Sequence, residues 1–174
     1  QVRGVKLIEG DRHNLNGILK NLSFDVVADI TAYNEKDIID FVKELGSYGQ
    51  YIMISSSAVY PEYGVQPFLE ESEKAANIFW GTYGTDKIAA EKALLERVKD
   101  AYILRPPYLY GPMNNVYREA FVFDCALADR KFYLPKDGDM KLQFFHVEDL
   151  CRLMEVIIKE KPEEHILNVG NVEA

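Results

Sequence analysis

Residues 51–57 read Tyr-Ile-Met-Ile-Ser-Ser-Ser, an apolar run that passes directly into three serines. Such a short apolar run is typical of a strand buried on both faces of a parallel sheet. Residues 25–30, Asp-Val-Val-Ala-Asp-Ile, have the same character, and residues 38–45 between the two runs carry apolar side chains at helical spacing. Asn34 is a candidate cap at the start of this helix, and Gly46 is the candidate residue that ends it. Strand, helix and strand in this order predict a parallel β-α-β unit.

The same alternation continues in both directions along the chain. Each further strand is expected at a short apolar run, and each further helix at an apolar stripe of helical period. The strands are expected at 5–8, 101–104, 132–134, 142–145 and 166–170, the helices at 15–22, 83–99, 117–129 and 147–159, and a loop at 108–112. The pattern predicts an α/β fold, a doubly wound parallel sheet with helices on both faces. Because the chain opens and closes on strand-like runs, we expect this sheet to be truncated at both ends.

Composition narrows the classes of function that the chain can have. The chain has 174 residues, of which 48% are hydrophobic, and this is enough for one buried core. Its net charge of −8 argues against a nucleic-acid partner, because a surface that binds nucleic acid is usually basic. No apolar run reaches the roughly 18 residues of a membrane span and no signal peptide is visible, so we expect a cytoplasmic protein. The three histidines are scattered, so no metal site is expected.

Tyr83 and Lys87 form the candidate chemical centre of the chain. On the helix expected at 83–99, residues four apart lie on one face, one turn from each other. A free tyrosine has a pKa of about 10, and a neighbouring cation lowers this pKa, which suits the phenol to acid–base chemistry. In a chain with 11 tyrosines about one such pair arises by chance, so an exposed pair without a function is the alternative.

Polar residues follow three of the expected strands. They stand at 29–31 (Asp-Ile-Thr), at 55–57 (Ser-Ser-Ser) and at 105–107 (Arg-Pro-Pro). Ligands of open parallel sheets bind at the carboxyl ends of the strands, which meet at one edge of the sheet. We therefore expect a binding site where these three segments come together.

Five short segments add a more specific signal. They are Ile-Ser-Ser-Ser-Ala-Val-Tyr at 54–60, Tyr-Gly-Thr-Asp-Lys at 83–87, Leu-Arg-Pro-Pro-Tyr-Leu-Tyr-Gly-Pro at 104–112, Phe-His-Val-Glu-Asp-Leu at 145–150 and Leu-Asn-Val-Gly at 167–170. In this order and at this spacing they resemble the NAD-dependent epimerase/dehydratase family, which consists of extended or atypical short-chain dehydrogenases/reductases. The resemblance implies a Rossmann-like fold, with residues 1–112 as a partial dinucleotide-binding domain and residues 113–174 as a partial substrate-binding region. It also implies an NAD(P)-dependent epimerase, dehydratase or reductase that acts on a sugar-like hydroxyl by hydride transfer.

The resemblance assigns a catalytic set of three residues. Tyr83 would be the general acid and base, and Lys87 would lower the pKa of Tyr83 and hold the nicotinamide ribose. Ser56 would form a hydrogen bond with the substrate oxygen, and Ser57 is the rival for this role and an expected substrate contact. Simple capping of the backbone is the alternative role of Ser56.

The cofactor implied by the resemblance is NAD or NADP, with NAD favoured. Asp11 resembles the family's adenine-contacting acid, and an exposed turn aspartate is the alternative. The other implied cofactor contacts are Arg12, Ile30, Thr31, Ala32, Ser55, Lys87 and Pro106, and the implied substrate contacts are Ser57, Tyr108 and Gln143. The family's glycine-rich phosphate loop is absent from this chain, and that loop is the part that cradles the pyrophosphate.

Residues 10–13 (Gly-Asp-Arg-His) and 25–33 resemble most the atypical branch of the family that also holds chloroplast stem-loop RNA-binding proteins. A nucleotide- or RNA-associated protein without catalysis, on the same scaffold, is therefore the alternative to an enzyme. The expected partner is a small molecule, either a sugar or a nucleotide sugar. Leu142, however, stands where the family's nucleotide-sugar enzymes often carry an arginine that pairs with diphosphate.

A homodimer is the expected assembly if the chain follows the family's use of the tyrosine-bearing helix as an interface. Three apolar residues of that helix are candidates for this contact, although they could equally pack on the sheet. They are Ile88, Leu94 and Leu95.

Overall fold

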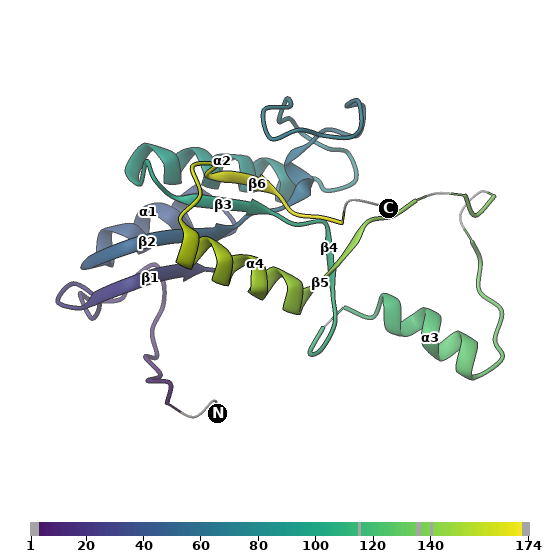
Figure 1. Cartoon of the computed structure of the whole chain (residues 1–174), viewed down its shortest axis with the longest axis horizontal. Coiled ribbons are helices and arrows are strands. Elements are labelled where there is room, and N and C mark those ends of the chain that lie inside the picture. Colours follow the sequence, from purple (N-terminus) through teal and green to yellow (C-terminus); the bar gives the residue numbers. More distant parts are fainter. Residues whose placement is uncertain (1–3, 115, 135–136, 140, 172–174) are drawn as a thin grey trace. The chain divides into compact units, whose positions relative to one another are not determined.

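The computed structural model describes residues 4–114, 116–134, 137–139 and 141–171 (Figure 1). Its elements are β1 (Ser23–Asp29), α1 (Glu35–Glu44), β2 (Ser47–Ile54), the 3₁₀ helix η1 (Ser57–Val59), α2 (Thr82–Arg97), β3 (Tyr102–Arg105), β4 (Tyr108–Tyr110), α3 (Glu119–Leu127), β5 (Phe144–His146), α4 (Val147–Glu160) and β6 (Ile166–Asn168). The chain forms two compact units, the first built from the chain up to Arg105 and from Glu163–Leu167, and the second from Pro106–Pro162 and the chain from Asn168. That residues 1–112 bind a dinucleotide and residues 113–174 a substrate stays a prediction.

The first unit is built on a parallel sheet. Strand β2 lies between β1 and β3 and runs parallel to both, with Val27 opposite Tyr51 and Met53 opposite Ile103. Strand β6 is the next neighbour of β3, and the N–H of Ile103 donates to the carbonyl of His165 at 2.8 Å. The predicted α/β class with a parallel sheet is thus confirmed.

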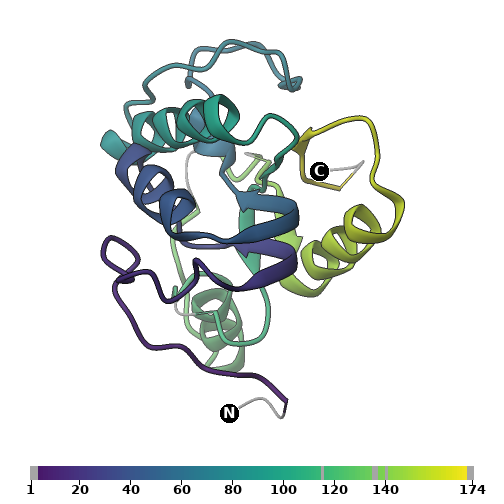
Figure 2. The ribbon, with the colours of Figure 1, turned by 90° about the vertical axis from the view of Figure 1, so that its left-hand side faces the viewer.

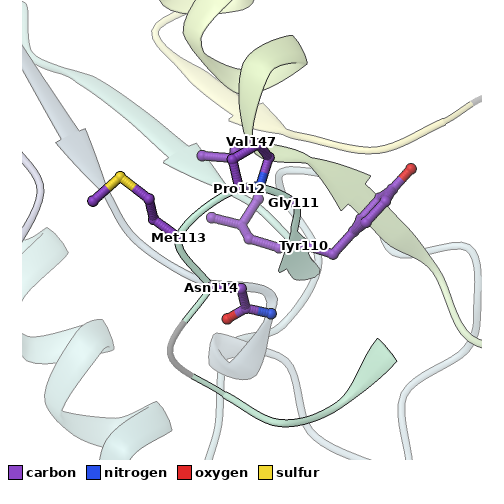
Figure 3. Close-up of a pocket in the computed structure, with 7 residues that line it drawn as sticks. Tyr110, Gly111, Pro112, Met113, Asn114 and Val147 are labelled. Atoms are coloured by element: carbon purple, nitrogen blue, oxygen red, sulfur yellow. The ribbon is translucent and has the colours of Figure 1, made fainter. Parts of the chain in front are cut away.

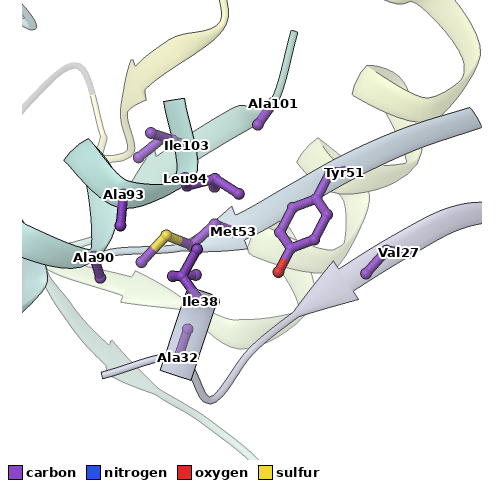
Figure 4. Packing of buried hydrophobic residues seen from close by; sticks show 10 residues of the cluster. All are labelled: Val27, Ala32, Ile38, Tyr51, Met53, Ala90, Ala93, Leu94, Ala101 and Ile103. Atoms are coloured by element: carbon purple, nitrogen blue, oxygen red, sulfur yellow. The ribbon is translucent and has the colours of Figure 1, made fainter. Parts of the chain in front are cut away.

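Helices α1 and α2 lie side by side on one face of this sheet (Figure 2). Ile38 of α1 and Leu94 of α2 are fully buried against Met53 of β2, and Tyr51 belongs to the same cluster (Figure 4). Each such aliphatic side chain contributes about 2 kcal/mol when it is removed from water. The apolar stripes that predict the two helices therefore become the core of the first unit.

Helix α1 begins where the sequence predicts. The Asn34 side chain accepts a hydrogen bond from the N–H of Asp37 at 3.0 Å, and the Asp37 carboxylate accepts one from the N–H of Asn34 at 3.2 Å. This reciprocal capping box satisfies two N–H groups that a helix otherwise leaves open. Gly46 has a different role from the predicted one, because a Cβ there would lie 2.1 Å from the carbonyl oxygen of Leu22. Close contact with that backbone, rather than a left-handed helix end, requires the glycine.

Three expectations for the amino-terminal part are wrong. Residues 5–8 form no strand: Val5 and Leu7 are exposed, and β1 is the first strand of the described sheet. Residues 15–22 form successive turns instead of a helix, because Asn16 and Gly17 have positive φ values of 52° and 76°. Strand β1 is not buried on both faces, because more buried and more exposed residues alternate along it.

The second unit contains a two-stranded parallel sheet, β4 and β5, and helices α3 and α4. The predicted loop at 108–112 is therefore partly wrong, because Tyr108–Tyr110 is a strand paired with Phe144–His146. The strand expected at 132–134 is also wrong, since these residues form no regular element and Tyr133 is exposed. Within the described ranges, no helix is both long and apolar enough to span a membrane.

Candidate active site

Lys87 is a buried ammonium at the carboxyl ends of two neighbouring parallel strands. Its side chain is 2% exposed, and Nζ donates to the carbonyl of Ile54, the last residue of β2, at 2.9 Å and to the carbonyl of Ala32, beyond the end of β1, at 2.6 Å. Burial lowers the pKa of Lys87 to about 8, although the negative charges of Asp29 and Glu91 oppose that change. In the described part of the chain, two of the three donors of this ammonium have acceptors and the third makes no hydrogen bond.

Gly84 fixes the position of this part of α2. A Cβ on Gly84 would lie 2.4 Å from the carbonyl oxygen of Ala58, which is a backbone atom of η1. The absence of a side chain therefore lets the first turn of α2 rest directly on η1, immediately after the serines at the end of β2. This close approach brings the Tyr83–Lys87 segment and the serine segment to the same edge of the sheet.

Tyr83 lies in the first turn of α2 and is 36% exposed. The Lys87 ammonium is 6.0 Å from the centroid of its ring. Two other aromatic rings flank Tyr83, with centroid distances of 6.4 Å to Tyr33 and 6.3 Å to Trp80. The phenol is thus open to a ligand while its ring stands beside a cation and two further rings.

The three serines have three different environments. The Ser55 hydroxyl is buried and donates to the Glu91 carboxylate at 2.6 Å. The Ser56 oxygen accepts the N–H of Ala58 at 3.2 Å and caps η1, while Ser57 is exposed as the first residue of η1. The capping alternative for Ser56 is thus present in the structure, but its hydroxyl hydrogen remains able to donate. The assigned roles of Ser55, Ser56 and Ser57 stay predictions.

A buried ion pair joins helix α2 to the carboxyl end of β3, next to the serine segment. Arg105, the last residue of β3, donates from Nε and Nη2 to the two oxygens of Glu91 at 2.9 and 2.8 Å, and both side chains are essentially inaccessible to solvent. Arg105 also donates to the Tyr60 hydroxyl at 2.7 Å, and Lys74 lies 3.4 Å from Glu91. Burial alone would lower the pKa of Arg105, but the hydrogen bonds and charge of Glu91 raise it above its usual value. The pair connects α2, β3 and the Ser55 hydroxyl.

The Arg12 guanidinium is held by hydrogen bonds to residues at and after the end of β1 and to the first turn of α1. Its guanidinium donates to both oxygens of Asp29 at 3.2 and 2.8 Å, to the Thr31 hydroxyl at 3.1 Å and to the carbonyl of Asp37 at 3.2 Å. Asp29 also accepts the Tyr51 hydroxyl at 2.7 Å. Burial and the charge of Asp29 raise the pKa of Tyr51. The predicted cofactor contact of Arg12 stays a prediction, and a ligand would have to share a guanidinium that is already engaged.

The other predicted cofactor residues of the first unit lie around the same strand end. Asp11 is exposed, and its carboxylate accepts the N–H of His13 at 2.9 Å. This geometry is that of an exposed turn aspartate, which is the alternative to an adenine contact. Ile30 and Thr31 are exposed, whereas Ala32 is fully buried and presents its carbonyl to Lys87. Their contacts with a cofactor stay predictions.

The remaining predicted site residues belong to the second unit. Pro106 is buried, Tyr108 lies on β4 under the Arg118 guanidinium at 4.9 Å, and Gln143 donates to the carbonyl of Asn171 at 2.8 Å. Their contacts with cofactor and substrate stay predictions.

The second unit also holds a shallow pocket of about 140 Å³ (Figure 3). Strand β4, the loop after it and the first residue of α4 form its mostly apolar lining, which contains none of the predicted site residues. The lining residues are Leu109, Tyr110, Gly111, Pro112, Met113, Asn114 and Val147.

Two of the three candidate dimer residues face the interior of the first unit. Leu94 is fully buried in the core cluster and Leu95 packs against it, while Ile88 is half-buried. The alternative that they pack on the sheet thus describes Leu94 and Leu95. A homodimer stays a prediction.

Sequence reasoning placed Asp29 and Arg105 at the expected site, but it missed Tyr33, Trp80 and the pairing of Glu91 with Arg105 as parts of this region. A signal for the pair exists, because Glu91 follows Lys87 by four residues on a helix face that becomes buried, where an acid needs a cation. No comparable signal marks Tyr33, since its position beside Tyr83 depends on how separate segments pack. Trp80 stands three residues before Tyr83, and the N–H of Tyr83 donates to its carbonyl at 3.1 Å, so its position beside Tyr83 follows from the local turn at the start of α2.

Comparison with known proteins adds the family. The profile of the NAD dependent epimerase/dehydratase family matches residues 19–170. The chain is 29% identical over 167 residues to the chloroplast stem-loop binding protein of 41 kDa b of Arabidopsis thaliana, covering 94% of this chain and 43% of that protein. It is 27% identical over 179 residues to the probable GDP-L-fucose synthase 1 of Oryza sativa subsp. japonica, covering 90% of this chain and 53% of that protein. The chain thus spans about half the length of these curated relatives.

Solved structures share the fold. The dTDP-glucose 4,6-dehydratase of Bacillus anthracis, solved in complex with NAD, matches with a TM-score of 0.70 and 21% identity, over 86% of this chain and 52% of that chain. The UDP-glucuronic acid 4-epimerase of Bacillus cereus, also solved with NAD, matches with a TM-score of 0.71 and 17% identity, over 94% of this chain and 59% of that chain. At these identities the likeness establishes a Rossmann-type α/β fold. Since the family profile covers most of the sequence, the chain belongs to the NAD-dependent epimerase/dehydratase family.

Proposed function

We propose that the protein is an NAD(P)-dependent epimerase, dehydratase or reductase that acts on a sugar-like hydroxyl substrate through Tyr83, Lys87 and Ser56. The observation that carries this proposal is the buried ammonium of Lys87, held at two strand ends one helical turn from the exposed Tyr83. Burial of an ammonium is costly, so its retention here favours a functional role. Relatives named as GDP-L-fucose synthases and similar structures named as sugar-nucleotide epimerases and dehydratases support the reaction class and the substrate class.

Each residue of the set has a distinct task. Tyr83 exchanges the proton of the substrate hydroxyl, and the Lys87 ammonium lies 6.0 Å from the centroid of its ring. Ser56 donates its hydroxyl hydrogen to the substrate oxygen and so orients it towards Tyr83. When bound, the nicotinamide supplies the acceptor and donor of the hydride.

The residues present fit the nicotinamide ribose and the adenine of a nicotinamide dinucleotide. The unused donor of Lys87 suits a ribose hydroxyl, and the exposed carboxylate of Asp11 suits a hydrogen-bond donor of the adenine. We favour NAD over NADP, in line with the NAD complexes among the similar structures.

The Tyr83→Phe variant tests the proposal, because it removes the hydroxyl and keeps the ring. We expect kcat to fall about 10²- to 10⁴-fold, the usual contribution of general acid–base catalysis, with little change in KM. Turnover is measured on the protein with NAD or NADP and a panel of UDP-, dTDP- and GDP-linked sugars. Tyr63→Phe, on an exposed tyrosine of the loop before α2, is the matched control and should keep wild-type turnover. Wild-type turnover by Tyr83→Phe would contradict the role of Tyr83.

The alternative of an RNA-associated protein without catalysis is less favoured. One similar protein is named for stem-loop binding, but the net charge of this chain is −8. Phosphate contacts need basic residues, and the affinity they provide falls steeply with salt. Retention of a stem-loop RNA at physiological salt, together with no turnover of any sugar in the panel, would favour this alternative.

A further inference from the structure

Three aromatic rings from three backbone segments converge on the candidate centre. Tyr33 comes from the connection between β1 and α1, Trp80 from the turn before α2, and Tyr83 from α2 itself. Tyr83 is the common neighbour, and its ring plane is tilted by 54° to Tyr33 and by 57° to Trp80. Tyr33 and Trp80 remain 53% and 39% exposed, so two large rings beside the acid–base residue face solvent. Such exposed aromatic surface is a common mark of a ligand contact.

The backbone holds both flanking rings in place. The N–H of Tyr33 donates to the Asp37 carboxylate, which caps α1, at 2.6 Å. The N–H of Trp80 donates to the carbonyl of Asn77 at 3.1 Å, and the buried Asn77 side chain donates to the carbonyl of Tyr60 at 3.0 Å. Rings on an anchored backbone bind with little loss of conformational entropy.

We propose that Tyr33 and Trp80 are the two walls of a subsite that holds the pyranose ring of the substrate against Tyr83. This inference rests on the proposed function, which it deepens by naming residues that position the sugar. A pyranose has C–H groups on its ring faces and hydroxyl groups at its rim. The C–H groups lose contact with water against the aromatic walls, while a rim hydroxyl meets the Tyr83 hydroxyl.

The charges around the rings favour a neutral sugar over an oxidised nicotinamide as the group between the walls. The Lys87 ammonium already lies 5.0 Å from the centroid of the Tyr33 ring. This cation uses the attraction of the ring for positive charge, so a second cationic ring gains less there. The apolar face of a pyranose needs only contact area and is not penalised in this way.

Saturation-transfer difference NMR tests the subsite, with UDP-glucose, UDP-glucuronic acid and NAD as separate probes. We expect the pyranose C–H protons of a UDP-sugar to receive saturation, and Tyr33→Ala and Trp80→Ala each to weaken its binding about tenfold. Affinity for NAD should stay within about twofold of wild type. Phe79→Ala is the matched control, because Phe79 is exposed beside Trp80 and has no ring contact with Tyr83 among the described residues. Tyr33→Phe keeps a ring and should retain the affinity, and thermal unfolding verifies that every variant is folded.

The outcomes separate this inference from the proposed function. Loss of NAD affinity with unchanged sugar affinity would overturn it, since the rings would then hold the nicotinamide. Saturation confined to the uracil protons, or no binding of either UDP-sugar, would also overturn it. If both alanine variants turned over a sugar substrate at the wild-type rate with unchanged KM, Tyr33 and Trp80 would not contact the pyranose, while the proposed function would still hold. If sugar binding depended on the rings of Tyr33 and Trp80 but no sugar were turned over, the subsite would be supported and the proposed function would be refuted.

Discussion

At the scale of the residue, Lys87 shows how one side chain depends on its surroundings. An exposed lysine has a pKa of about 10.4, whereas burial lowers that of Lys87 to about 8. Two strand-end carbonyls compensate for the hydration that the ammonium loses. The same lysine on the solvent face of α2 would remain an ordinary surface cation, as the exposed Lys92 is.

This lowered pKa predicts a specific pH dependence of stability. Between about pH 8 and pH 10.4 Lys87 is protonated in the unfolded state and largely neutral in the folded state. The contribution of Lys87 to the free energy of unfolding therefore rises with pH in this window. Relative to Lys87→Met, the wild type should gain about 3 kcal/mol across that window. Urea denaturation at pH 7, 8, 9 and 10 measures the difference. Lys92→Met, on the same helix, should show no such gain, and a wild-type minus Lys87→Met difference that is flat with pH would contradict the prediction.

At the scale of the element, two contacts hold α2 in place, one at its first turn and one on its buried face. Gly84 lets its first turn rest on η1, and Glu91 connects its buried face to Arg105 of β3. The helix therefore carries Tyr83 and Lys87 on a rigid support, which catalytic geometry requires.

Gly84→Ala should destabilise the first unit by about 2 kcal/mol, because its Cβ would overlap the Ala58 carbonyl oxygen. Inside an unhindered helix, glycine to alanine stabilises by about 1 kcal/mol, so the expected effect has the opposite sign. Chemical denaturation measures it. Lys92→Ala, exposed on the same helix, should change stability by less than about 0.5 kcal/mol. A stabilised Gly84→Ala variant would show that the close approach to η1 is absent.

The Glu91–Arg105 pair should behave as a coupled unit. Arg105→Met alone leaves a buried carboxylate with fewer partners and should cost about 3–5 kcal/mol, and Glu91→Leu alone should cost a similar amount. The double variant should lose clearly less stability than the two single losses added together, because no buried charge is left unpaired and the partly exposed Lys74 can be solvated. A double-mutant cycle in urea measures the coupling energy, and strictly additive effects would contradict the pairing.

At the scale of the whole molecule, the chain consists of two compact units that differ in how they bury their elements. The central strands β2 and β3 end in continuous runs of buried residues, whereas most residues of α3 in the second unit are exposed. Local opening is cheapest where few apolar contacts must be broken.

Hydrogen exchange should report this difference directly. Amides of β2 and β3 should exchange most slowly, and those of α3 at least about 100-fold faster, because α3 contributes only Cys125 as a buried residue. Mass spectrometry after pepsin digestion resolves these segments. The amides of β1, on the sheet edge, serve as an internal reference and should be intermediate. Equal protection of α3 and β2 would contradict the prediction.

Much of the fold was predictable because it depends on local pattern. The capping box at Asn34 and the apolar stripes of α1, α2 and α4 each lie within one segment, and each element is present close to its predicted bounds. The failures occur where a local pattern is overridden. The leucine spacing at 15–22 indicates a helix, but the left-handed backbone at Asn16 and Gly17 turns the chain, and only the burial of Leu15 and Leu19 survives from the pattern.

The sequence by itself determined that Tyr83 and Lys87 share a helix face and that serines follow a buried strand, because both relations involve neighbours along the chain. Only the tertiary structure decided that Lys87 is buried on the carbonyls of Ala32 and Ile54, which lie 55 and 33 residues away. It also decided that Tyr33, from the connection between β1 and α1, lies beside Tyr83. The physical reason is that burial, charge and ring contacts depend on which distant segments pack together. The pattern of a single segment does not contain that information.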